Sequence, residues 1–185
     1  MTKRVLTAVG VLMLMAVFGQ AAQAAPVLGG QLTYTGGNVT VTSLPVSSGF
    51  ESELGLYDAA LNRILYIMND EPPGVVQTFN PGALGVVVGS ELIFGIRISG
   101  GGGPLGAQYF MGPASRNPDN VIHATVDNLG GGVFNVGFED LDGGGDLDYD
   151  DNRFRFEGGI AAVPEPASLT LLGLGLLSLD RKSVV

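Results

Sequence analysis

The chain has 185 residues, a formal net charge of -9 and 30 glycines. It contains no cysteine, which excludes a disulfide framework, a thiolate zinc site and a thiol nucleophile. The acidic balance argues against nucleic-acid binding, because few basic side chains are present to neutralise phosphates. This length suits one domain together with targeting segments.

The first 24 residues have the order of a secretory signal. Lys3 and Arg4 precede an apolar run over residues 5–18, and Ala22-Gln23-Ala24 follows. This order predicts a signal peptide over residues 1–24 that is cleaved after Ala24. The alternative is a membrane anchor, but the apolar run is short for spanning a bilayer.

The strands expected in the following domain, residues 25–162, are short and are separated by glycine and proline. We predict strands over residues 32–34, 39–42, 54–57, 64–68, 75–79, 92–98, 109–111, 121–127, 133–138 and 153–157. Such spacing favours an all-β fold, an antiparallel β-sandwich of jelly-roll type. The glycines 100–103 are expected to form a loop rather than a phosphate site, since no lysine follows them.

The acidic side chains of the exported region are unevenly distributed. Residues 25–163 contain no lysine, and five arginines face sixteen carboxylates for a formal charge of -11. Seven of these carboxylates lie within the thirteen positions 139–151. This local surplus indicates cation binding rather than general solubility.

The stretch over residues 137–156, GFEDLDGGGDLDYDDNRFRF, joins two runs with the two-residue period of strands. A divalent cation would relieve the repulsion among its carboxylates, and we predict calcium because it takes six to eight oxygen ligands in loose geometry. The glycines 143–145 permit a tight loop. The stretch is similar to an EF-hand only superficially, because Asp151 stands where that loop needs glycine. A solvated acidic turn is the alternative.

The carboxylates expected to bind metal fall into two groups. Alternate residues of a straight strand are about 6.6 Å apart, so the loop must curl for several of them to reach one ion. The first group is Asp140, Asp146 and Asp148, and the second is Glu139, Asp150, Asp151 and Asp119.

His123 is the one histidine of the chain. Alternation places it with Val121 and Thr125, on the opposite face from Ile122, Ala124 and Val126. It is expected near the acidic loop, bonded either to a ligand carboxylate or to the backbone.

Three stretches carry a family resemblance. Residues 137–149 and Asp151 resemble the closing motif of domain of unknown function 4114, although Asp150 stands where that family usually has asparagine. Residues 116–123, RNPDNVIH, and more weakly residues 50–58, FESELGLYD, are also similar to it. The resemblance implies a secreted, β-rich, calcium-binding module and no established activity.

The C-terminal stretch, residues 163–185, resembles a PEP-CTERM sorting signal. Pro164-Glu165-Pro166 precedes an apolar run to Leu179, and Arg181-Lys182 follows. The resemblance implies recognition by an exosortase in a Gram-negative bacterium and removal of the tail. A short hydrophobic helix over residues 167–179 would be about 20 Å long, less than the roughly 30 Å hydrocarbon core, so only transient membrane insertion is expected.

From these observations we predict an exported, non-catalytic β-sandwich that is stabilised by calcium. Signal peptidase and exosortase are its expected partners during export. Its expected location is the cell surface, outer envelope or exopolysaccharide matrix. Binding of carbohydrate is the alternative function. A hydrolase is disfavoured, since a crowd of acids in a chain without tryptophan is not the paired-carboxylate site of a glycosidase.

Overall fold

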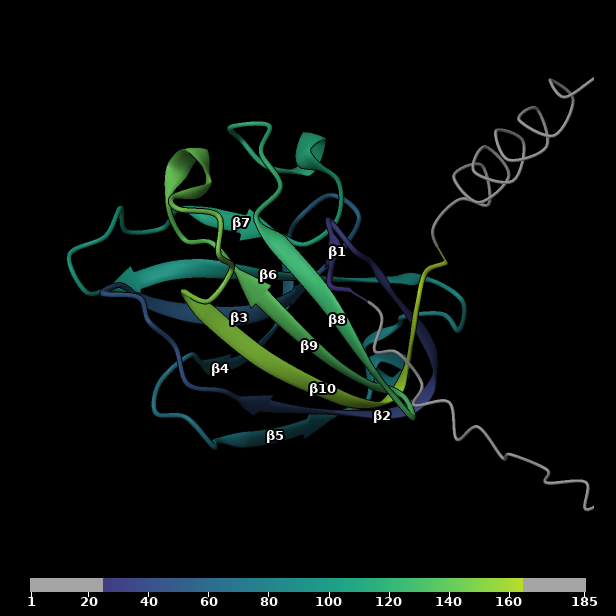
Figure 1. Ribbon diagram of the computed structural model, residues 1–185. Helices are drawn as coiled ribbons and strands as arrows, with labels where there is room; N and C mark the ends of the chain where they lie inside the picture. Colours follow the sequence, from purple (N-terminus) through teal and green to yellow (C-terminus); the bar gives the residue numbers. More distant parts are fainter. Residues whose placement is uncertain (1–24, 165–185) are drawn as a thin grey trace, which may run out of the picture.

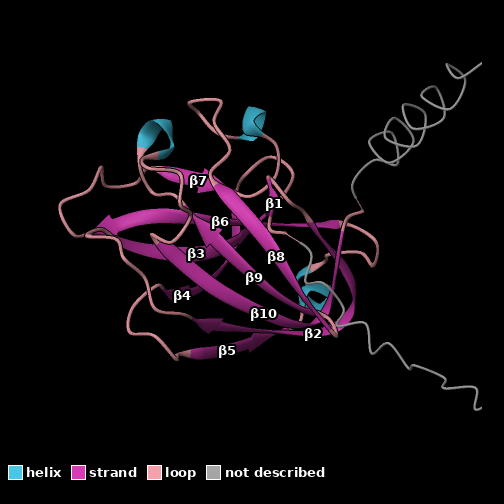
Figure 2. Ribbon diagram, viewed as in Figure 1, coloured by secondary structure: helices cyan, strands magenta, loops and turns pink. Residues whose placement is uncertain are grey.

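The computed structural model describes residues 25–164, which form an antiparallel β-structure with three short 3₁₀ turns (Figures 1 and 2). The predicted signal peptide, the predicted C-terminal helix and the predicted sorting residues Glu165, Pro166, Arg181 and Lys182 lie outside this range. Within it, no helix has the length and apolar character needed to cross a membrane. The strands are β1 Val27–Leu28, β2 Leu32–Ser43, β3 Glu51–Tyr57, β4 Arg63–Asn69, β5 Val76–Phe79, β6 Glu91–Gly100, β7 Gln108–Phe110, β8 Ala124–Gly130, β9 Val133–Phe138 and β10 Asn152–Ala162.

The strands follow the order β1-β8-β9-β10-β2-β6-β3-β4, with β5 paired to β2 and β7 paired to β6. Every pair is antiparallel. Strands β1, β8, β9, β10, β2 and β5 form one half of this structure, and β6, β3, β4 and β7 form the other. The two halves meet where Leu32 and Thr33 of β2 pair with Leu92 and Glu91 of β6. The prediction of an all-β antiparallel sandwich is confirmed.

Phenylalanines from both halves meet in the core. Phe154 and Phe156 alternate with half-buried arginines along β10 and are fully buried. Phe156 contacts Phe94 of β6 with ring centroids 4.4 Å apart, and Phe138 at the end of β9 meets Phe154 edge-on at 6.3 Å. This packing anchors the ends of β9 and β10, and the acidic loop joins those two ends.

Two local predictions are wrong. Gly36 and Gly37 do not separate two strands, because β2 runs through them opposite an irregularity in β10 at residues 158–160. His123 precedes β8, which begins at Ala124, and it is fully buried rather than on the face opposite Ala124. A period-two pattern fails there because the residues before Ala124 form a loop in which Asn120 has a φ of 60°.

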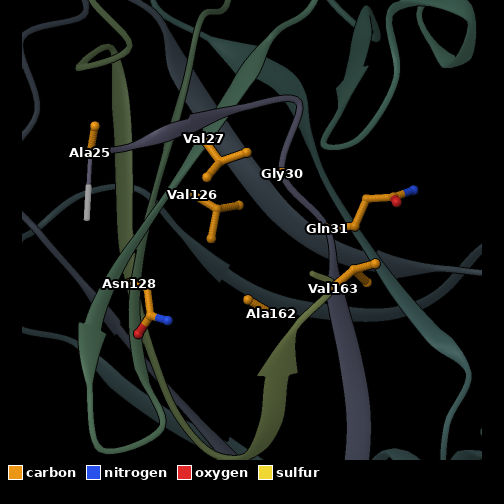
Figure 3. Close-up of a pocket in the computed structure, with 8 residues that line it drawn as sticks. All are labelled: Ala25, Val27, Gly30, Gln31, Val126, Asn128, Ala162 and Val163. Atoms are coloured by element: carbon orange, nitrogen blue, oxygen red, sulfur yellow. The ribbon is translucent and has the colours of Figure 1, made fainter. Parts of the chain in front are cut away.

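Both ends of the described chain border one apolar pocket of 430 Å³ (Figure 3). Among the described residues that line it, no side chain is ionisable, and Gln31 and Asn128 bring the side-chain hydrogen-bonding groups. The other lining residues are Ala25, Val27, Gly30, Val126, Ala162 and Val163. The predicted cleavage point after Ala24 and the predicted sorting motif that begins at Pro164 are therefore each adjacent in sequence to a residue of this pocket.

Candidate metal site

The acidic loop is the connection between β9 and β10. Phe138 pairs with Asn152 at its base, and residues 139–151 form the loop. A short 3₁₀ turn, Asp142–Gly144, opens into Gly145 at φ 57° and ψ -129°, a conformation that only glycine adopts readily. The glycines 143–145 all have positive φ, as the sequence predicts.

The backbone curls further at two residues that are not glycine. Leu147 and Tyr149 have φ values of 63° and 59°, in the left-handed region that costs such residues about 1 kcal/mol or more. A left-handed residue on each side of Asp148 turns the loop back on itself. Asp146 and Asp148, which a straight strand would hold apart, thus approach each other.

Gly137 of β9 allows the loop to lie against the sheet. A Cβ atom at this position would stand 2.1 Å from the carbonyl oxygen of Tyr149, which is far inside van der Waals contact. The absence of a side chain lets the backbone beside Asp148 rest directly on β9. The path of the loop therefore depends on a residue outside the loop.

Three carboxylates converge inside the curl. Glu139, Asp146 and Asp148 each place an oxygen within 4.8 Å of the other two, and they are one such group in the described part of the chain. Two oxygens that are each about 2.4 Å from a calcium ion can be no more than about 4.8 Å apart, so the spacing is compatible with one ion. Asp146 and Asp148 are exposed, whereas Glu139 is fully buried.

The two carboxylate oxygens of Glu139 have different surroundings. Oε1 accepts a hydrogen bond from the backbone N–H of Tyr149, but the buried Oε2 has no hydrogen-bond partner. Leaving a buried carboxylate oxygen unsatisfied is costly. Burial raises the pKa of Glu139, and the charges of Asp146 and Asp148 raise it further against the Tyr149 hydrogen bond. A cation beside Oε2 would remove both penalties.

Asp140 is not a member of this cluster, although the sequence analysis placed it in the first group of ligands. It is buried and accepts hydrogen bonds from Ser48 Oγ at 2.5 Å and Asn152 Nδ2 at 3.2 Å. Its backbone N–H donates to Asp151 Oδ2 at 3.2 Å. Burial, together with the charges of Asp140 and Glu139, raises the pKa of Asp151 to about 7 against that N–H bond.

Asp119 fastens a separate segment to the acidic loop. Its Oδ2 lies 2.7 Å from His123 Nε2 and accepts from the Gly143 N–H at 2.8 Å, and its Oδ1 accepts from the Val121 N–H. Burial by itself would raise the pKa of Asp119, but these hydrogen bonds outweigh it and hold the pKa below its usual value. With these bonds, Asp119 occupies a supporting position around the three-carboxylate cluster.

His123 joins the same support. Its Nδ1 lies 3.0 Å from the carbonyl oxygen of Glu139, and its ring stacks on Tyr109 with centroids 4.0 Å apart. His123 therefore has both a backbone partner and a carboxylate partner, but that carboxylate, Asp119, lies outside the three-carboxylate cluster. The histidine holds the backbone of Glu139 in place while the side chain of Glu139 faces the cluster.

Of the remaining expected ligands, Asp150 is hydrogen-bonded to Ser47 Oγ outside the cluster. The sequence reading missed Ser47, Ser48 and Gly137 as parts of the site. The two serines are about a hundred positions from their partners, and no local pattern distinguishes them. For Gly137, its place in a strand of alternating hydrophobic residues was an available signal, because such a glycine often marks a close backbone approach.

Comparisons with protein-family models, with curated proteins and with solved structures found no match to this chain.

Proposed function

We propose that the protein is an exported, non-catalytic β-sandwich module whose acidic loop binds calcium and thereby stabilises the fold. The proposal is supported by Glu139, which brings one carboxylate oxygen within 4.8 Å of Asp146 and Asp148 and whose buried Oε2 has no hydrogen-bond partner. A hard dication suits three carboxylates better than a soft transition metal does. Export and exosortase sorting belong to the proposal through the two terminal segments, with the cell surface or exopolysaccharide matrix as the place of action.

The expected energetics are modest. Extracellular calcium modules bind with dissociation constants of roughly 10⁻⁴ to 10⁻³ M. At ten times the dissociation constant, binding to the folded state alone adds about 1.4 kcal/mol of stability. Millimolar calcium would therefore raise the melting temperature by several degrees.

The test is a thermal melt of the purified full chain in chelator and in millimolar calcium, with magnesium as the ion control. We expect calcium to raise the melting temperature and Asp146→Asn or Asp148→Asn to reduce that rise. Asp142→Asn is the matched control, since Asp142 lies in the same loop and outside the cluster. Equal melting temperatures in chelator and calcium would overturn the proposal.

Export has its own test. The full chain produced in a host that carries an exosortase is expected to lose residues 1–24 and the tail beyond the Pro164-Glu165-Pro166 motif, as read by intact mass. Replacing Glu165 with alanine is expected to retain the tail. Retention of both ends in the parent chain would refute the sorting proposal without bearing on calcium.

A further inference from the structure

A polar groove of 300 Å³ lies beside the three-carboxylate cluster, over the face of β8, β9 and β10 that is turned away from the core. Register aligns Thr125, Gly137 and Arg153 across the three strands, and the backbone of Tyr149 lies against Gly137 in the middle of this row. The acidic loop forms one wall through residues 148–150. The hydrogen-bonding side chains that line the groove include Thr125, Asp127, Asn135, Asp148, Asp150 and Arg153.

The chemistry of this lining suits sugar hydroxyls. A guanidinium only donates hydrogen bonds, carboxylates only accept them, and an amide and a hydroxyl do both. Vicinal hydroxyls of a sugar also donate and accept, so they can satisfy both kinds of group at once. Three carboxylates against one arginine disfavour an anionic ligand. The volume is at the lower end of the range of about 300–1,000 Å³ for small-molecule sites, which suits one or two sugar rings.

Asp148 belongs both to this groove and to the three-carboxylate cluster. An ion bound by the cluster would therefore stand at one end of the groove. Calcium takes six to eight oxygens, and three side chains fill such a shell only if each binds through both of its oxygens. Asp146 and Asp148 are exposed, so the open coordination positions face solvent, where a ligand hydroxyl can occupy them.

We propose that this groove binds a neutral glycan, and that the calcium ion at Asp148 contributes to the binding. This inference rests on the calcium site of the proposed function. The ligand class is the neutral hexose oligosaccharide, recognised through its hydroxyls by Arg153, Asn135 and the acidic side chains of the loop and of β8.

The experiment measures retention of the full chain on immobilised gluco-, manno- and galacto-oligosaccharides, with uronate and sulfated oligosaccharides as the anionic arm. Any detergent in the buffer must lack a sugar headgroup, because such a headgroup would compete for the groove. We expect binding to at least one neutral oligosaccharide in calcium, and weaker binding in chelator. Arg153→Gln is expected to weaken it about tenfold or more, as the loss of a hydrogen bond to a charged group does. Arg97→Gln, on β6 and outside the groove, is the matched control and should bind as the parent does.

The outcomes separate the two proposals. Absence of neutral glycan binding, binding confined to the anionic arm, or no effect of Arg153→Gln would overturn the glycan site, while a calcium-dependent melting temperature would leave the calcium proposal intact. Glycan binding equal in chelator and calcium, without a calcium-dependent melt, would overturn the calcium proposal and the role of the ion in the groove. Thr125→Val provides a second groove variant should Arg153→Gln unfold.

Discussion

Replacing Gly137 with alanine tests the closest approach in the site. The added Cβ would stand 2.1 Å from the Tyr149 carbonyl oxygen, whereas ordinary contact begins at 3.4 Å. The loop backbone would have to move by about 1.3 Å. Metal–ligand distances tolerate deviations of only about 0.2 Å, so Asp148, which precedes Tyr149, would leave its ligand position.

The expected results concern both stability and calcium. Overpacking of this kind typically destabilises by about 1–3 kcal/mol, and for a domain of this size each kcal/mol lowers the melting temperature by roughly 2–4 °C. We expect Gly137→Ala to melt several degrees below the parent in chelator and to lose most of the calcium-induced rise. The assay is a thermal melt followed by circular dichroism, with and without calcium.

The matched control is Gly49→Ala. Gly49 has no atom within 4 Å of the position of an added Cβ and does not have a positive φ, so its substitution should leave both the melt and the calcium response close to those of the parent. If Gly137→Ala also behaves like the parent in both measurements, the loop does not depend on resting against β9 and the reasoning is refuted.

Three further predictions concern individual carboxylates. Glu139→Gln is expected to melt at or above the temperature of the parent in chelator, because it removes a buried charge near two others, and to lose the calcium-induced rise in melting temperature. Glu157→Gln, exposed on β10, is its control. A retained rise in Glu139→Gln would contradict the role of Glu139. Burial raises the pKa of Asp151 from its usual 3.8 to about 7 in the folded protein, so its contribution to stability is present below about pH 4 and is lost as the pH rises through 7. In chelator the melting temperature should therefore fall between those values, and Asp151→Asn should flatten the fall, whereas an unchanged slope would argue against the raised pKa. Asp119→Ala is expected to destabilise the folded protein by about 1.5–3 kcal/mol through the loss of charged hydrogen bonds, as measured by urea unfolding. An effect no larger than that of Asp142→Ala would show that the hydrogen bonds of Asp119 to His123 and Gly143 do not stabilise the fold.

Much of the strand framework follows from local pattern. The prediction for residues 133–138 coincides with β9, and the strands predicted over residues 54–57 and 64–68 lie within β3 and β4, which pair with each other. The buried faces carrying Phe154 and Phe156 also follow from alternation. These features were readable because a strand with one buried face must repeat every two residues.

The arrangement of the acidic loop was only partly readable. The sequence located the surplus of carboxylates and the glycines that let the chain turn, but it ranked Asp140 above Glu139. Glu139 and Asp140 are adjacent, and only Glu139 belongs to the cluster of the described residues. This difference depends on His123, which bonds the Glu139 carbonyl, and on Ser48, which bonds the Asp140 side chain. No spacing rule predicts such contacts, because they join segments far apart in the chain.

From residue order alone it could be predicted that this protein is built of short strands and that its negative charge is concentrated in one connection, and both ends resemble export signals. Those properties depend on residue type and local periodicity, and both can be read directly from the sequence. The convergence of Glu139, Asp146 and Asp148, and the groove that adjoins them beside Gly137, become visible only in the folded chain. The physical reason is that strand register and the left-handed turns at Leu147 and Tyr149 set distances between side chains, and these are properties of the whole fold.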